Sequence, residues 1–151
     1  MTTLAYRRAV GADFIHIKAL NEKLLPDNYD WYIWWHVQHT GSTYVVTDFA
    51  RIVGYIVATW NKWPLDNPYI FSLAVLPEFR RQGVGRRLVQ CVWDDAKRTN
   101  HPLLLHCRAS NTTAQSLYRS IGFAEVQRIP SHYPSVDGSG RDDGLLLRKN
   151  D

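Results

Sequence analysis

A short basic turn carries residue types that could bind a phosphate group. Residues 80–87 (Arg-Arg-Gln-Gly-Val-Gly-Arg-Arg) contain four arginines, two glycines and no acid. Glycine lets a ligand lie against the main chain, and the first turn of a helix leaves N–H groups without internal partners at the positive end of the helix dipole. Arginine adds bidentate donors for phosphate oxygens. The turn therefore predicts a diphosphate site, the alternative being a surface turn with solvated arginines.

Three phosphate-binding motifs could account for this turn. A P-loop needs a Gly-Lys-Ser/Thr ending, whereas Gly85 is followed by two arginines. A dinucleotide fingerprint needs a small residue where Leu88 stands, and it normally opens its domain. The remaining pattern, Arg/Gln-x-x-Gly-x-Gly/Ala, is matched by Arg80, Gly83 and Gly85. In this pattern the sequence resembles the GNAT superfamily of acetyl-coenzyme A-dependent N-acetyltransferases, in which the turn holds the pyrophosphate of the coenzyme.

Hydrophobic patterning predicts the elements that position the turn. Apolar or alternating runs predict strands at residues 4–8, 43–48, 52–60, 69–76, 102–109, 123–128 and 144–148. Helices are expected after Asp13, near Trp31, from the turn to residue 99, and from Asn111 to Gly122. Residues 61–68 are interpreted as a polar connection. Residues 129–143, rich in Pro, Gly, Ser and Asp, are interpreted as an exposed loop.

The order of these elements, β-α-α-β-β-β-α-β-α-β-β, is also the GNAT order. The resemblance implies a single domain over residues 1–151 with an α/β fold: a mixed, mostly antiparallel central sheet of about seven strands flanked by four helices. A second signature, Asn111-x-x-Ala114-x-x-Leu117-Tyr118-x-x-x-Gly122-Phe123, resembles the final coenzyme-binding helix of the superfamily. Together the two signatures imply these cofactor-binding residues: Leu73, Ala74, Val75, Arg80, Arg81, Gln82, Gly83, Val84, Gly85, Arg86, Asn111 and Tyr118.

Acetyl transfer from a thioester to an amine needs a proton acceptor for the amine and stabilisation of the departing thiolate. Tyr118 matches the tyrosine that the superfamily places near the sulfur, so the resemblance implies that its phenol hydrogen-bonds or protonates the thiolate. The pKa of the acceptor amine determines how strong a base the enzyme needs. An α-amino group has a pKa of about 7.8 and a lysine amine one of about 10.4. An enzyme for N-termini therefore needs only a mild base.

A narrower resemblance, to the catalytic subunits of protein N-terminal acetyltransferases, is carried by residues 25–29 (Leu-Pro-Asp-Asn-Tyr), Tyr69, His106 and Tyr133. It implies that Tyr69 and His106 hold the water that deprotonates the amine, or that Asp27 is the base. Because the chain has both types of residue, the choice among these three stays open. His106 could also be a core histidine, and Asp27 a turn residue or a helix N-cap. The same resemblance implies an acceptor groove, with His132 where a second tyrosine is common, lined by Pro26, Asp27, Tyr29 and Tyr133.

Composition limits the class of partner. The chain has 151 residues, 45% of them hydrophobic, which is typical of a globular domain with a core. A formal net charge of +4 is modest, which favours a local anionic ligand over a nucleic-acid surface. Cys91 and Cys107 stand outside any Cys-x-x-Cys pattern and are interpreted as reduced thiols of a cytoplasmic protein. No apolar run approaches the roughly 20 residues that cross a bilayer.

These observations lead to one expectation and its rivals. We expect acetyl-coenzyme A as cosubstrate, no metal, and direct transfer through a ternary complex to a protein or peptide N-terminus. No nucleic-acid or membrane partner is expected, and an auxiliary subunit or a homodimer is compatible with the sequence. The first alternative is a small amine, such as a polyamine or antibiotic, as acceptor. The second is a coenzyme-binding module without catalysis.

Overall fold

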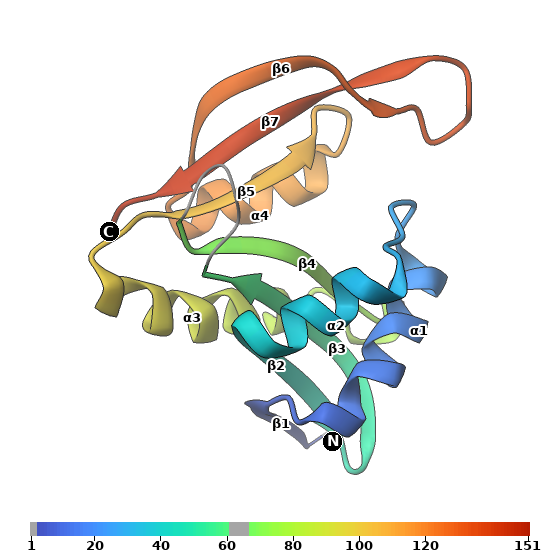
Figure 1. Cartoon of the computed structure of the whole chain (residues 1–151), viewed down its shortest axis with the longest axis vertical. Helices are drawn as coiled ribbons and strands as arrows, with labels where there is room; N and C mark the ends of the chain where they lie inside the picture. The colour runs from blue at the N-terminus through green and yellow to red at the C-terminus, as the bar shows by residue number, and fades with distance from the viewer. Residues whose placement is uncertain (1–2, 61–66) are drawn as a thin grey trace.

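The computed structural model describes residues 3–60 and 67–151 (Figure 1). Most of the expected connection at residues 61–68 lies outside these ranges. The strands of the described part are β1 (Leu4–Arg8), β2 (Gly41–Asp48), β3 (Arg51–Thr59), β4 (Tyr69–Val75), β5 (Leu103–Arg108), β6 (Ala124–Pro134) and β7 (Arg141–Lys149). Its α-helices are α1 (Phe14–Leu24), α2 (Trp31–Thr40), α3 (Val84–Ala96) and α4 (Thr112–Ile121).

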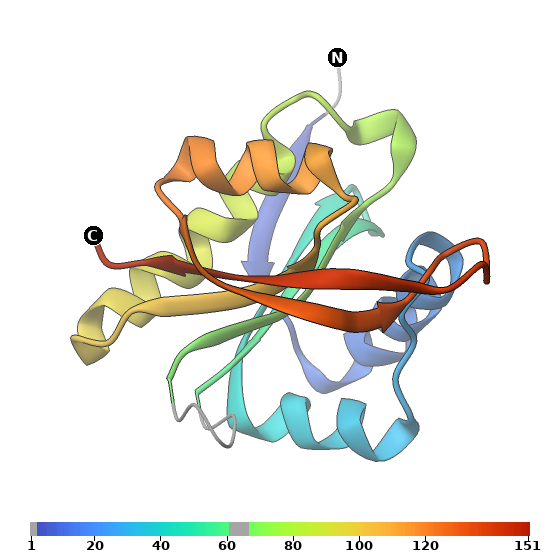
Figure 2. The ribbon, with the colours of Figure 1, turned by 90° about the horizontal axis from the view of Figure 1, so that it is seen from above.

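The strands form a seven-stranded sheet in the order β1-β2-β3-β4-β5-β7-β6. Only β4 and β5 pair in parallel, and every other neighbouring pair is antiparallel. Helices α1 and α2 cover one face of the sheet, and α3 and α4 cover the other (Figure 2). The expected α/β fold with a mixed, mostly antiparallel sheet and four helices is confirmed.

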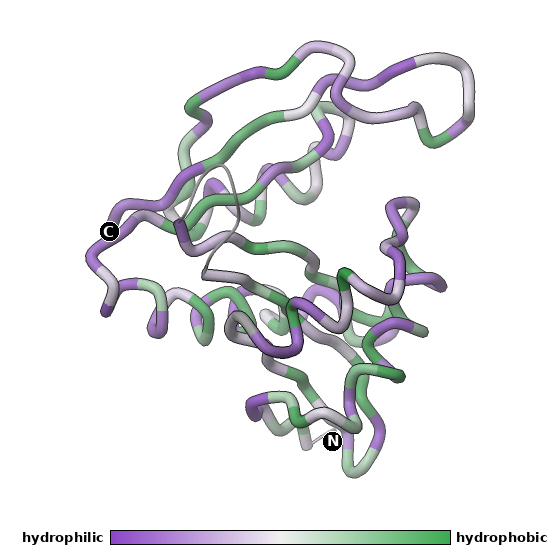
Figure 3. The backbone as a smooth tube through the Cα atoms, in the orientation of Figure 1, coloured by the Kyte–Doolittle hydropathy of each residue, from purple (hydrophilic) through white to green (hydrophobic). Residues whose placement is uncertain are grey.

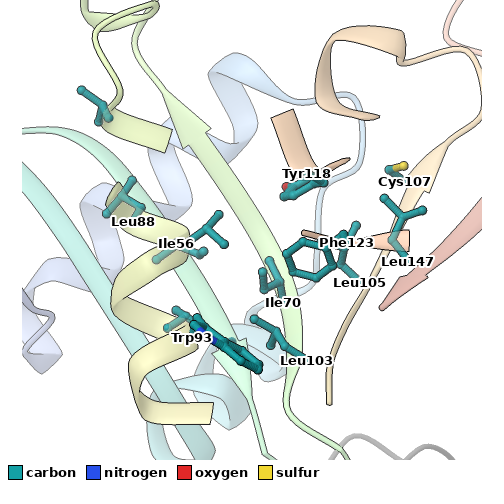
Figure 4. Close-up of a cluster of buried hydrophobic side chains, with 14 of the residues drawn as sticks. Ile56, Ile70, Leu88, Trp93, Leu103, Leu105, Cys107, Tyr118, Phe123 and Leu147 are labelled. Carbon is teal, nitrogen blue, oxygen red and sulfur yellow. The ribbon is translucent and has the colours of Figure 1, made fainter. Parts of the chain in front are cut away.

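Each face of the sheet has its own buried cluster. The cluster under α3 and α4 includes Ile56, Leu88, Leu103 and Tyr118 (Figure 4), and the cluster under α1 and α2 includes Ile17, Trp34 and Tyr55. The central strands therefore have apolar side chains on both faces, which is why most of β4 and the first half of β5 are hydrophobic in Figure 3.

The interpretation of residues 129–143 as an exposed loop was wrong for most of its length. β6 continues to Pro134 and β7 begins at Arg141, so only residues 135–140 connect the two strands. Nearly all of β6 is exposed, and the strand lies at the edge of the sheet. A strand without a buried face has no apolar alternation to reveal it, and Figure 3 shows the outer part of this hairpin as largely hydrophilic.

Candidate functional site

A cavity forms where β4 and β5 separate. The two strands pair only at Tyr69↔Leu104 and Ile70↔Leu105, and beyond these positions they diverge (Figure 1). The cavity at this point has a volume of about 170 Å³. Its walls come from both faces of the sheet: Pro26, Asp27, Tyr29, His106 and Tyr133 contribute from the α1–α2 side, and Leu73, Asn111 and Tyr118 from the α3–α4 side. The sequence-predicted residues of these two groups are thus brought together.

A bulge in β4 shapes one wall of the cavity. Val57 of β3 pairs with Ser72, whereas Ala58 pairs with Ile70, so Phe71 is the extra residue. Phe71 contacts the Tyr29 ring, with centroids 4.3 Å apart, and the Ser72 hydroxyl lies 2.7 Å from the Tyr55 hydroxyl. Two consecutive residues of β4 therefore both contact residues on the α1–α2 side. The bulge was not predicted, because no Gly or Pro marks it.

His106 lines the cavity, and Tyr69 lies beside it in the sheet. The Tyr69 hydroxyl is 2.5 Å from His106 Nδ1, and Tyr69 is only 5% exposed. Burial raises the pKa of Tyr69 well above its ordinary value, so its phenol stays protonated at neutral pH. Tyr69 is not itself part of the cavity wall; it is joined to the site through the imidazole.

Asp27, the third candidate base, is held in an ion pair with Arg108. Arg108 Nη2 donates to Asp27 Oδ1 at 2.8 Å and Nε to Oδ2 at 3.4 Å. The guanidinium also donates to the Pro134 carbonyl and lies over the Tyr133 ring at 4.7 Å. Arg108 was missed as a site residue. A lone arginine in an apolar strand was the available signal, since a buried charge needs a partner.

Tyr118 approaches the cavity from α4. Its ring is buried and meets Phe123 edge-on, with centroids 5.6 Å apart (Figure 4). Burial raises the pKa of Tyr118, and burial also raises the pKa of the nearby Cys107 thiol to about 11. Both groups therefore remain protonated at neutral pH. Cys107 packs in the α3–α4 cluster while His106 contacts Tyr69 on the other side, so these neighbours point to opposite faces of the sheet.

The basic turn leads directly into α3. Arg81 and Gly83 have positive φ angles of 61° and 77°, and Gly83 is the N-cap. The first helical hydrogen bond runs from Arg87 N–H to Gly83 O, so the amides of Val84, Gly85 and Arg86 precede it at the start of the helix. This geometry is that of an anion site at a helix N-terminus.

Most arginine side chains of the turn make contacts within the protein. Arg80 Nε donates to the Val75 carbonyl at 2.9 Å, Arg86 Nη2 donates to Ser120 Oγ at 2.6 Å, and the Arg87 guanidinium lies over the Tyr6 ring at 4.8 Å. Arg80 and Arg86 thus brace the turn against β4 and α4. The backbone amides, more than the side chains, define the anion site.

The turn and α4 are close neighbours. A Cβ on Gly85 would lie 3.4 Å from Leu117 Cδ2, so a small residue fits here. Asn111 caps α4, because its Oδ1 accepts a hydrogen bond from Ala114 N–H at 3.0 Å. The amide NH₂ of Asn111 is the part of the side chain that can donate to a ligand.

Within residues 3–60 and 67–151, no group of three or more His, Cys, Asp or Glu side chains is placed to hold a metal ion. No helix in the same part of the chain is long and apolar enough to cross a membrane.

The fold combines a helix N-terminus whose geometry suits an anion with a cavity where β4 and β5 separate. The profile of the acetyltransferase (GNAT) family matches residues 11–123. The chain belongs to this family.

Individual relatives are similar over different lengths. A [Ribosomal protein bS18]-alanine N-acetyltransferase of Escherichia coli is 40% identical over 84 residues, 55% of each chain. This chain therefore spans about half the length of that relative. An N-alpha-acetyltransferase of Sulfolobus acidocaldarius is 31% identical over 141 residues, covering 84% of this chain and 83% of the relative. The structure of Arabidopsis thaliana NAA60 in complex with acetyl-CoA has a TM-score of 0.84 at 18% identity, covers 97% of both chains, and shares the fold.

Proposed function

We propose that this protein is an acetyl-coenzyme A-dependent N-acetyltransferase that transfers the acetyl group directly to the α-amino group of a protein or peptide N-terminus. The observation that carries the proposal is the cavity at the separation of β4 and β5. Its wall contains Tyr118 from one face of the sheet and His106 from the other. Direct transfer needs a cavity that both substrates can enter, because they must meet in one complex. The names of the relatives favour an N-terminal amine as acceptor.

The α3–α4 face suits the coenzyme. Amides at the start of α3, from Val84 to Arg86, would donate to the pyrophosphate, together with the preceding amides of the turn. The edge of β4 at Leu73 and the amide of Asn111 would hold the pantetheine arm, since both lie at the same cavity. Acetyl-coenzyme A, when bound, supplies the thioester. The protein residues bind it and orient its reactive end toward the cavity.

On the other face, we assign His106 as the base and Tyr69 as the residue that orients it. Asp27 is a poorer candidate, because both of its oxygens already accept hydrogen bonds from Arg108. An α-amino group has an ordinary pKa of about 7.8, so a neutral imidazole can accept its proton, directly or through water.

Tyr118 is assigned to the departing thiolate. Because burial raises its pKa, its phenol is protonated at neutral pH. A thiol has an ordinary pKa of about 8.5, below that of a phenol, so complete proton transfer from Tyr118 would be uphill. A hydrogen bond from the phenol to the developing thiolate is the role that fits these acidities.

The remaining predicted residues would receive the acceptor. Pro26, Tyr29 and Tyr133 line the α1–α2 side of the cavity, and we propose that they contact its first residues. The Asp27–Arg108 pair would keep this wall in shape, because Arg108 also contacts Tyr133.

The acceptor can be tested with a panel of amines. Peptides with varied first residues, polyamines and amine antibiotics would be incubated with acetyl-coenzyme A, with thiol release as the assay and mass spectrometry to locate the acetyl group. We expect acetylation at the peptide α-amino group and none on peptides with a blocked N-terminus. Turnover of small amines alone would support the small-amine alternative. Coenzyme binding by calorimetry without any turnover would support a non-catalytic module.

Location and assembly belong to the same proposal. The free thiols of Cys91 and Cys107 support a cytoplasmic location, where reduced cysteines are usual. An auxiliary subunit or a homodimer is tested by light scattering on the purified chain and by recovery of a stoichiometric partner from its own cells.

A further inference from the structure

A second bulge places another imidazole against His106. Between Ile129↔Gly144 and Tyr133↔Asp142, β6 has residues 130–132 where β7 has only residue 143. Ser131 within the bulge has a φ of 54°, which is uncommon outside glycine. Its N–H donates to Asp143 Oδ1 at 2.9 Å, and its carbonyl accepts from Arg141 Nη2 at 3.0 Å. Two residues of β7, Asp143 and Arg141, therefore hold the bulge in place.

Gly144 provides the space for the next residue of the bulge, His132. A Cβ at position 144 would lie 2.9 Å from His132 Cβ and Cδ2, so a larger residue would displace the ring. The ring of His132 stacks on that of His106, with centroids 5.3 Å apart and planes at 24°. The Tyr133 ring meets it edge-on, with centroids 4.6 Å apart. His106 thus lies between the Tyr69 hydroxyl and the His132 ring.

We infer that His132 is a positioning residue for the proposed base: its ring holds His106 against Tyr69, and its charge, when it is protonated, keeps His106 neutral. This inference rests on the proposed function, in which His106 must be neutral to accept a proton. His132 is the more exposed of the two residues. With His132 protonated, a proton on His106 would bring two positive charges to about 5 Å, where they repel strongly.

Other groups of the described residues also lie around His106. Tyr69 faces it from β4 and Tyr133 lies nearby on β6; burial raises the pKa of both phenols, so both stay neutral. Arg108, on β5, is balanced by Asp27 from the connection between α1 and α2. β7 contributes Gly144 and Leu146, which carry no charge. Histidine is the side-chain type that changes charge between pH 5 and 8.

The test separates the charge of His132 from its shape. His132→Phe keeps a flat ring and removes the charge. The pH dependence of kcat/KM would be measured with an N-terminal peptide, and the His106 imidazole would be titrated by NMR in the full-length protein without coenzyme. We expect the acid limb of the rate profile and the His106 titration midpoint to move to higher pH by about one unit in the variant. His132→Gln gives the same two readouts if His132→Phe does not fold.

A matched control removes an imidazole elsewhere. His101→Phe changes an exposed histidine between α3 and β5, and it should move neither readout. A His106 midpoint that is unchanged in both His132 variants would overturn the inference even if the enzyme is active. If the wild-type protein acetylates no amine but the midpoint moves as expected, the proposed function fails while the coupling between the two rings stands.

Discussion

Tyr69 and Tyr118 are both buried phenols, but their neighbours suit them to different tasks. The Tyr69 hydroxyl is hydrogen-bonded to the His106 imidazole, which suits the proposed role of orienting it. Tyr118 lines the cavity itself and packs against Phe123. Burial raises the pKa of both, which rules out a role for either as a phenolate at neutral pH. Removing the two hydroxyls should therefore produce different kinetic defects.

Tyr118→Phe should lower kcat by about 100-fold, because the hydrogen bond to the thiolate forms mainly in the transition state. The coenzyme Kd should change by less than about threefold, since the ring remains. Steady-state kinetics measure kcat, and calorimetry measures the coenzyme Kd. Tyr32→Phe, on an exposed tyrosine of α2, is the matched control and should leave both unchanged. Unchanged turnover in Tyr118→Phe would remove the proposed role.

Asp27→Asn distinguishes a wall residue from a base. The variant leaves the guanidinium of Arg108, whose side chain is 9% exposed, without its counter-charge, so the free energy of unfolding should fall by about 1–3 kcal/mol. KM for the peptide should rise by about tenfold as the wall loosens, while His106→Gln should lower kcat by about 100-fold. Urea unfolding and steady-state kinetics measure these effects. The opposite pattern, with kcat lost in Asp27→Asn and kept in His106→Gln, would make Asp27 the base.

Among the elements, those with a buried face were the ones that the sequence predicted well. The apolar runs of β4 and β5 and the glycine turn before α3 carry local signals, because burial and positive φ restrict the residue types allowed. The bulge at Phe71 carries no such signal, whereas Pro130 was an available signal for the bulge at residues 130–132. Phe71 is displaced by pairing with β3, and His132 by pairing with β7. The resemblance predicted half of the residues that line the cavity, but the partners of Asp27 and His106 depend on these long-range pairings.

The turn before α3 allows a controlled test of the anion site. Gly83→Ala puts a Cβ on a residue with a φ of 77° and nothing within 4 Å, so the free energy of unfolding should fall by about 1 kcal/mol. The coenzyme Kd should rise by about tenfold, since the amides of the turn would move. Gly138→Ala has the same φ and the same open surroundings in the connection between β6 and β7. Gly138→Ala should lower the free energy of unfolding by a similar amount and leave the coenzyme Kd unchanged. Equal effects of the two substitutions on Kd would show that the turn does not bind the coenzyme.

For the whole molecule, the separation of β4 and β5 divides the sheet into two parts that other contacts must hold in place. On the N-terminal side, Asp95 of α3 accepts hydrogen bonds from Arg8 on β1 and from Ser42 and Tyr44 on β2, at 2.7–2.8 Å. This carboxylate joins the helix that begins at the turn to the edge of the sheet. The helix cannot shift on the sheet without breaking these bonds, so Asp95 helps to fix the anion site at a distance.

Asp95→Asn should therefore destabilise the protein in a pH-dependent way. Burial acts to raise the pKa of Asp95, but the hydrogen bonds from Ser42, Tyr44 and Arg8 outweigh it, and the pKa is lowered in the folded state. A lowered folded pKa means that the stabilisation is present above the ordinary value of about 3.9 and is lost as the pH falls through the folded value. The wild type should exceed the variant by about 2 kcal/mol in free energy of unfolding at pH 7, and the difference should shrink below about pH 4. Urea unfolding at both pH values measures this difference.

Asp94→Asn, at an exposed neighbouring carboxylate paired with Lys97, should lower the free energy of unfolding by well under 1 kcal/mol. A difference for Asp95→Asn that grows on acidification would mean that the ionised carboxylate is not what holds α3 to β1 and β2.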